Sequence, residues 1–111
     1  MKKLASILLL LIGFSMLHAE LQEVRGVLTQ KVEDGIDHGY AGRRYNFKFT
    51  NQNDYSVWLE MELWAHYNGY DSDPANLVNT KSITLKAGES YIWKVSTYDN
   101  SYVKYKAYKK E

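Results

Sequence analysis

Residues 45–64 read YNFKFTNQNDYSVWLEMELW, two alternating stretches joined by a polar segment. In the first stretch, Tyr45, Phe47 and Phe49 alternate with polar residues. In the second, every other residue from Val57 to Leu63 is aliphatic or methionine. A period of two places the apolar side chains on one face of an extended strand. The segment therefore predicts two half-buried strands, and it indicates an all-β fold.

The same alternation continues on both sides of this segment. We expect further strands near residues 21–32, 77–86, 91–97 and 103–107, the first of them irregular around Gly26. Polar segments separate these strands, and the one at 33–43 is rich in glycine. No segment after residue 20 has the period of a helix. The sequence therefore predicts six to seven short strands and almost no helix.

The stretch FKFTNQNDYSVWLEMELW (47–64), followed by ITLKAGESYIWKV (83–95), resembles the strand-and-turn rhythm of immunoglobulin-like modules in exported bacterial proteins. The number and spacing of the strands predict a small antiparallel β-sandwich, and the length of the chain predicts a single domain over residues 20–111. The resemblance implies that this sandwich is immunoglobulin-like. It concerns the fold and transfers no functional residue. The alternation predicts a core that contains Phe47, Phe49, Leu59, Met61, Leu63, Leu85 and Trp93.

Residues 1–19 have the pattern of a secretory signal peptide: two lysines, an apolar run from Leu4 to Leu17, and Ala19 before the expected cleavage site. The run is shorter than the ~20 residues that span a bilayer, so we expect cleavage and no stable membrane anchor. The chain has no cysteine, which excludes disulfides and a lipid-modified cysteine. We predict a bacterial protein that is periplasmic or secreted.

The charge balance bears on the class of partner. The chain has 111 residues, 14 basic and 13 acidic, and loss of residues 1–19 would turn its formal charge from +1 to −1. Nucleic-acid-binding domains usually carry a clear basic surplus. We therefore expect no nucleic acid among the partners.

The third and last strands carry complementary residues on one face. If the aliphatic residues of 57–63 face the core, the residues between them face outward. Placed antiparallel, the two outward sets would bring aromatic to aromatic and glutamate to lysine. The predicted ligand-binding residues are Trp58, Glu60, Glu62, Trp64, Tyr102, Lys104, Lys106 and Tyr108.

Several strand pairings depend on more than local pattern. We expect 45–49 and 57–61 to form a hairpin with Phe49 opposite Val57; the rival is a sandwich corner in which 51–55 cross to the other sheet. The last strand has two alternatives, direct pairing with the third strand or a hairpin with 91–97.

Two further expectations concern the register of this hairpin and the turn at Gly88. The hairpin register would also place Arg44 across from Glu62. A tight turn at Gly88, which tolerates positive φ, would join 77–86 to 91–97 as a further hairpin.

Two segments contain oxygen or nitrogen ligands. NGYDSDPAN (68–76) lacks the register and closing glutamate of an EF-hand and is typical of a turn. EDGIDHG (33–39) has no thiol, and His66 is far along the chain. We therefore predict no metal and no cofactor. The residues considered were Asn68, Asp71, Asp73 and Asn76 for calcium, and Asp34, Asp37 and His38 for zinc.

No constellation for catalysis is evident. Glu60 and Glu62 would lie about 6 to 7 Å apart, close to glycosidase spacing, but an open sheet provides no cleft. The C-terminal lysines Lys104, Lys106, Lys109 and Lys110 suit anionic partners or protection of a sheet edge. We therefore predict that the protein is not an enzyme.

The sequence thus favours an exported, non-catalytic interaction module that binds another protein. The alternatives are a carbohydrate-binding module that uses the aromatic face, and a small enzyme inhibitor that presents the loop HYNGYDSDPAN (66–76). The ligand's identity, the oligomeric state and the host are left open.

Overall fold

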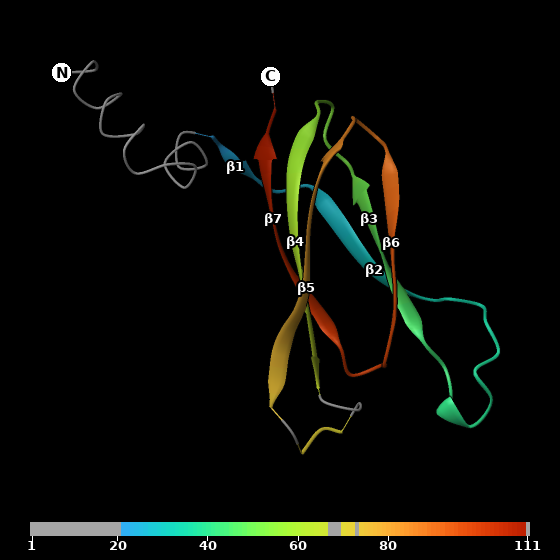
Figure 1. The fold of residues 1–111 in the computed structure, drawn as a ribbon. Helices are drawn as coiled ribbons and strands as arrows, with labels where there is room; N and C mark the ends of the chain where they lie inside the picture. The colour runs from blue at the N-terminus through green and yellow to red at the C-terminus, as the bar shows by residue number, and fades with distance from the viewer. Residues whose placement is uncertain (1–20, 67–69, 73, 111) are drawn as a thin grey trace.

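The computed structural model describes residues 21–66, 70–72 and 74–110. These residues form seven strands in two antiparallel sheets that make a β-sandwich (Figure 1). One sheet has the order β1-β7-β4-β5, and the other has the order β2-β3-β6. The predicted all-β class is confirmed, whereas the predicted signal peptide lies outside the described residues. The strands are β1 (Glu23–Val24), β2 (Val27–Glu33), β3 (Tyr45–Asn51), β4 (Val57–His66), β5 (Ala75–Leu85), β6 (Ser90–Thr97) and β7 (Tyr102–Lys109), and one short 3-10 turn, η1, covers Gly39–Ala41.

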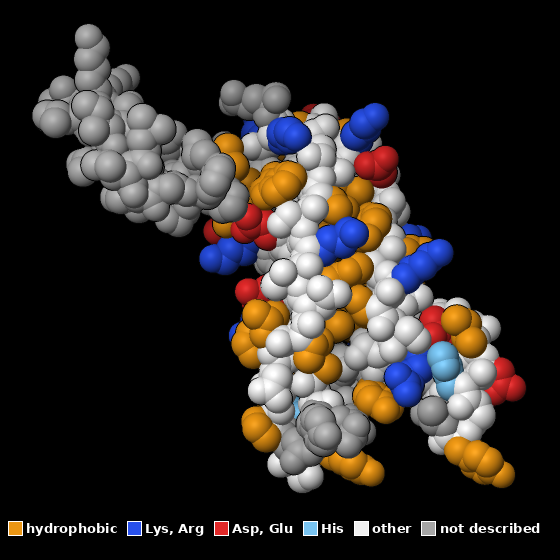
Figure 2. All heavy atoms as spheres, viewed as in Figure 1, with side chains coloured by type: hydrophobic (Ala, Val, Ile, Leu, Met, Phe, Trp, Pro, Cys, Tyr) orange, Lys and Arg blue, Asp and Glu red, His pale blue; other side chains and the backbone are white. Residues whose placement is uncertain are grey.

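The core lies between the two sheets and is built from alternate residues of each strand. Phe49 of β3 and Leu59 of β4 have no exposed surface. All seven residues predicted for the core are buried, which confirms the assignment of faces. Burial of each large side chain contributes about 1.5 to 3 kcal/mol to folding. Along the seam between β5 and β6, hydrophobic side chains remain visible at the surface (Figure 2).

The predicted hairpin between 45–49 and 57–61 is wrong. Phe49 lies opposite Thr29 of β2 and Tyr91 of β6, and β4 belongs to the other sheet, so neither the pair Phe49–Val57 nor the pair Arg44–Glu62 forms. The chain makes the rival sandwich corner instead. The physical reason is Asn51, whose buried side chain hydrogen-bonds to the Leu85 carbonyl of the opposite sheet and so stabilises the crossing of the chain between the sheets.

The predicted first strand is divided between the sheets. β1 pairs with β7, and β2 pairs with β3. The switch occurs at Gly26, which has φ +97° and accepts a hydrogen bond from the Gln52 amide at 2.7 Å. A Cβ at Gly26 would lie 2.5 Å from Oδ1 of Asn53. The irregularity expected here is therefore a crossing between sheets, which needs glycine for both its φ and its space.

The turn after β5 is also a crossing. Gly88 has the expected positive φ of 73°, but β5 and β6 lie in different sheets, so the predicted hairpin is wrong. The Gly88 amide donates to the carbonyl of Asn51 at 2.9 Å, and the Asn51 amide donates to the carbonyl of Glu89 at 2.9 Å. These long-range bonds replace the ladder that a hairpin would have formed.

Of the two alternatives for the last strand, the structure contains the direct pairing with the third strand. β4 and β7 are antiparallel neighbours, with Trp58 opposite Tyr108 and Trp64 opposite Tyr102. The alternative hairpin between 91–97 and the last strand does not form, because β7 lies between β1 and β4. The complementary outer residues thus share one surface.

Candidate functional site

The outer surface of β4 and β7 brings together all eight residues that the sequence predicted for binding. We call it the β4–β7 face. Lys104 and Lys106 are exposed, and Tyr102 is 40% exposed. The two tryptophans and two glutamates are half-buried, and Tyr108 is buried although it belongs to the outer set. The cross-strand rows are Trp58 with Tyr108, Glu60 with Lys106, Glu62 with Lys104, and Trp64 with Tyr102.

One end of the face is an aromatic stack. The rings of Trp64 and Tyr102 are nearly parallel, with centroids 6.4 Å apart and planes 5° apart. The Lys104 ammonium lies 4.5 Å from the centre of the Trp64 ring, within the range of a cation–π contact. The Trp64 Nε1–H donates to Oε1 of Glu62 at 3.1 Å. These contacts hold the Trp64 ring in place.

The other end repeats this plan. The Trp58 Nε1–H donates to Oε2 of Glu60 at 3.2 Å, so each tryptophan bonds to the glutamate nearer the centre of the strand. The Lys110 ammonium lies 6.0 Å from the Trp58 ring centre and donates to Oγ1 of Thr84 at 2.8 Å. Along the strands the face therefore runs aromatic, charged, charged, aromatic.

The centre of the face is a shallow hollow of about 350 Å³. The β4 side of the hollow is acidic and the β7 side is basic. The lining residues are Glu60, Glu62, Lys104, Tyr105, Lys106 and Tyr108. Such a surface offers paired charges and aromatic edges to a partner, and it does not enclose a small molecule.

The neighbouring strand β5 extends the face with hydroxyl groups. Thr84 lies opposite Trp58, and Thr80 lies opposite Glu62. Both threonines are exposed, as is Ser82 between them. Because β5 is an edge strand, this row widens the polar part of the surface toward solvent.

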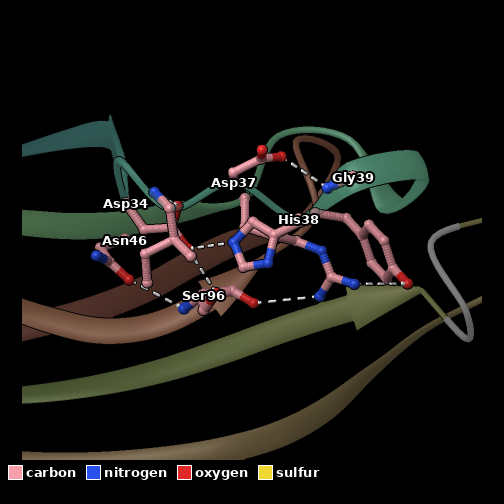
Figure 3. Close-up of polar contacts among 9 residues, drawn as sticks. Asp34, Asp37, His38, Gly39, Asn46 and Ser96 are labelled. Carbon is pink, nitrogen blue, oxygen red and sulfur yellow. Dashed lines mark hydrogen bonds and ion pairs between the residues drawn. The ribbon is translucent and has the colours of Figure 1, made fainter.

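A second polar cluster, centred on Asp34, was not predicted as a unit (Figure 3). Oδ2 of Asp34 accepts hydrogen bonds from the Ser96 hydroxyl at 2.7 Å and from Nε2 of His38 at 2.8 Å, and Oδ1 accepts the Ile36 amide at 3.0 Å. These bonds, with the Ser96 bond the largest cause, lower the pKa of Asp34 from 3.8 to about 2. The carboxylate is thus held ionised.

The cluster fixes an irregular part of β6. Ser96 has φ +47°, and its amide donates to Oδ1 of the buried Asn46 at 2.9 Å. The Arg44 guanidinium lies 4.1 Å from the centre of the Tyr98 ring and donates to the Ser96 carbonyl at 3.4 Å. In the sequence, Asp34 and His38 stand out only as potential metal ligands. No sequence pattern indicates Ser96, which is 62 residues away from Asp34.

The cluster contains a serine, a histidine and an aspartate, but these residues do not form a nucleophilic triad. In a triad the imidazole contacts the hydroxyl, whereas here Ser96 and His38 both bond to the same carboxylate oxygen. A carboxylate with a pKa of about 2 is also a weak proton acceptor near neutral pH. The arrangement acts as an anchor for the loop between β2 and β3.

The residues weighed for metal binding have other contacts. Asp71 accepts a hydrogen bond from Asn100, and Asn76 donates to the Pro74 carbonyl. Asn68 and Asp73 lie outside the described residues. Within the described ranges, no group of three or more histidine, aspartate or glutamate side chains is arranged to hold a metal ion.

No helix in the described part of the chain has the length and apolar character needed to cross a membrane. Comparison of the chain with protein-family models, curated sequences and solved structures finds no match.

Proposed function

We propose that this chain is an exported, non-catalytic β-sandwich module that binds another protein through the β4–β7 face. The observation that carries the proposal is the gathering of two tryptophans and two tyrosines around paired charges, on the outside of a sheet whose inner face already supplies the core. Aromatic residues are enriched in the centres of protein interfaces and contribute much of their binding energy.

A protein partner suits this surface better than a sugar. The Lys104 ammonium sits over the Trp64 ring, and a sugar stacked there would compete with it. Both indole N–H groups already donate to glutamates. A protein surface can cover the aromatic ends and the charged centre together, which uses the full length of the face.

We propose further that the sandwich is of immunoglobulin-like type. In that topology strands A, B and E share one sheet, and C pairs with F in the other. The order β2-β3-β6 corresponds to A-B-E, and the neighbours β4 and β7 correspond to C and F. β5 then occupies the C′ position beside C. The crossing after β3 supports the same correspondence.

Export is the remaining part of the proposal. Residues 1–19 have the lysines, apolar run and terminal alanine of a signal peptide, so we propose cleavage after Ala19 and delivery to the periplasm or outside of a bacterium. N-terminal sequencing of exported protein should start at Glu20. A start at Met1 would contradict this part.

The binding proposal is tested by expressing the tagged full chain and using the purified product in parallel on native envelope extract and on a glycan array. The test variant is Trp58→Ala with Trp64→Ala. The matched control is Leu28→Ala with Ile92→Ala, two exposed apolar residues of the opposite sheet. Thermal melting establishes that both variants remain folded.

We expect the parent and the control to capture the same protein, the tryptophan variant to lose at least about tenfold in affinity, and the glycan array to stay negative. Specific glycan binding that is lost in the tryptophan variant would replace the protein partner with a carbohydrate. Undiminished protein binding by the tryptophan variant would contradict binding through the β4–β7 face and would favour the loops as the binding site.

A further inference from the structure

We propose that the partner which fits the β4–β7 face is the same face of a second copy of this chain. The inference rests on the proposed function and names the partner. It follows from the order of residues in the four cross-strand rows. Each of the two end rows joins a tryptophan to a tyrosine, and each of the two central rows joins a glutamate to a lysine.

This order is self-complementary under one two-fold rotation. Consider an axis parallel to the strands, midway between β4 and β7 and above the face. Rotation about it places β4 of the second copy over β7 of the first, without a shift along the strand. Each residue then faces a copy of its own cross-strand neighbour, so Glu60 faces Lys106 of the second copy and Glu62 faces its Lys104.

The same rotation also matches the ends. Trp58 meets Tyr108 of the second copy, and Trp64 meets its Tyr102. Aromatic pairs of this kind add about 0.5 to 1.5 kcal/mol beyond the area that they bury. Each contact occurs twice because the interface is symmetric.

The other in-plane two-fold axis is excluded by charge. An axis perpendicular to the strands would lay β4 on β4 and β7 on β7. Glu60 would then face Glu62 of the second copy, and Lys104 would face its Lys106. Like charges brought together at an interface cost binding energy, so the face discriminates between the two arrangements.

The opposite surface of the sandwich lacks this property. The outward positions of β2, β3 and β6 include Lys48 and Lys94 but no acidic residue. A second copy placed there would bring lysines toward one another without acidic partners. Self-complementarity therefore belongs to the β4–β7 face and is not a general feature of the two sheets.

The shape of the face is compatible with this contact. Twisted sheets that pack face to face cross at about 30°, which preserves the central charged rows and leaves the ends to adjust. The hollow of about 350 Å³ lies over those central rows and leaves room for the long side chains of the second copy. Sheets in such contacts lie about 10 Å apart, a distance that glutamate, lysine and tryptophan side chains fill from both sides.

The dimensions predict a modest affinity. The seven residues from Trp58 to Trp64 extend about 20 Å, and four strands spaced about 4.8 Å apart give a width of less than about 20 Å. An area of this size lies at the lower end of specific interfaces. We therefore expect association in the micromolar range, weakened by salt because the central contacts are ionic.

The test is a charge exchange followed by mixing. Protein obtained by expressing the full chain is studied by sedimentation equilibrium from about 5 to 500 μM, at low and at high salt. Three variants are compared: E60K/E62K, K104E/K106E and the control K48E/K94E. The control makes the same charge change as K104E/K106E on the opposite surface.

We expect the parent and the control to dimerise, with weaker association at high salt. Each exchanged variant has a face of one sign, so each alone should be monomeric. A 1:1 mixture of the two should regain dimers, because acidic faces then meet basic ones. Recovery on mixing would show that each variant alone is monomeric because of charge repulsion and not because it is unstable, since unstable variants would not dimerise when mixed.

Melting curves verify that the exchanged variants fold. If either does not, E60Q/E62Q takes their place, because it removes the acidic stripe without repulsion; it should weaken dimerisation about tenfold or more and reduce its dependence on salt. A monomeric parent throughout the concentration range would overturn the inference, as would equal loss in K48E/K94E or no recovery on mixing.

The outcome also separates this inference from the proposed function. A different protein captured through the face by a monomeric parent would refute the second copy as partner and leave the binding function intact. A monomeric parent that captures nothing through the face would refute both.

Discussion

Asn51 of β3 donates its side-chain amide to the carbonyl of Leu85 at the end of β5, over 3.0 Å and with no exposed surface. The two strands belong to different sheets, so this bond joins the sheets at one end of the sandwich. The same amide donates to the carbonyls of Tyr55 and Lys86, and its oxygen accepts the Asn53 amide at 3.0 Å. One side chain therefore stabilises both crossings, after β3 and after β5.

We predict that Asn51→Ala lowers the free energy of unfolding by about 2 to 4 kcal/mol, because buried carbonyls lose their donor and a small cavity remains. Asn51→Asp keeps the shape but replaces the donor nitrogen, which faces three carbonyls, with an acceptor oxygen. The decrease in the free energy of unfolding caused by Asn51→Asp should be greatest at neutral pH and smaller in acid, because a protonated carboxyl can donate again. Urea unfolding at several pH values measures both effects, and an Asn51→Ala change below about 0.5 kcal/mol would contradict the role of this residue.

The assignment of inner and outer faces predicts opposite results for two adjacent residues. Trp93 is 5% exposed and lies opposite Phe47, whereas Ile92 is 44% exposed. We expect Trp93→Ala to cost about 3 to 5 kcal/mol and Ile92→Ala less than about 1 kcal/mol. Thermal and chemical unfolding provide the comparison. Similar losses at the two positions would mean that the strand faces are misassigned.

The Asp34 cluster predicts a dependence on acid. Because the pKa of Asp34 in the folded protein is about 2, below its usual 3.8, its stabilisation is present above pH 4 and is lost as the pH falls toward 2. Asp34→Asn should therefore lower Tm at pH 7, and the difference from the parent should shrink in acid.

Asp37→Asn is the matched control for this effect. Asp37 lies in the same loop and accepts one hydrogen bond, from the Gly39 amide at 2.9 Å. Its substitution should have the smaller effect at pH 7. A difference between parent and Asp34→Asn that stays constant from pH 7 to pH 2 would contradict the assigned pKa.

Much of the sandwich could be predicted because a period of two determines which side chains face inward. This pattern identified the core residues Phe49 and Leu59, and it placed Trp58 and Trp64 on one outer face. The sequence left the partner of the last strand open, but it predicted the register that β4 and β7 would have as neighbours, since aromatic and charged residues match in that alignment. The candidate site therefore emerged from two strands that are far apart in the chain.

The crossings could not be predicted in this way, because a hairpin and a sandwich corner share the same local turn residues. The choice depends on long-range bonds, such as that of Asn51 to Leu85 and that of Asn53 to the Arg25 carbonyl. The Asp34 anchor is likewise formed by residues from β3, β6 and a loop. Nothing in the local pattern around Ser96 indicates its positive φ.

We propose that this protein meets its partner at the β4–β7 face. Photo-crosslinking in the producing cells tests this directly, with benzoylphenylalanine placed at Lys104 in one variant and at Ile92, on the opposite sheet, in another. Both positions are exposed. We predict crosslinked protein from position 104 and little or none from position 92. Crosslinks from position 92 with none from position 104 would contradict binding through the β4–β7 face.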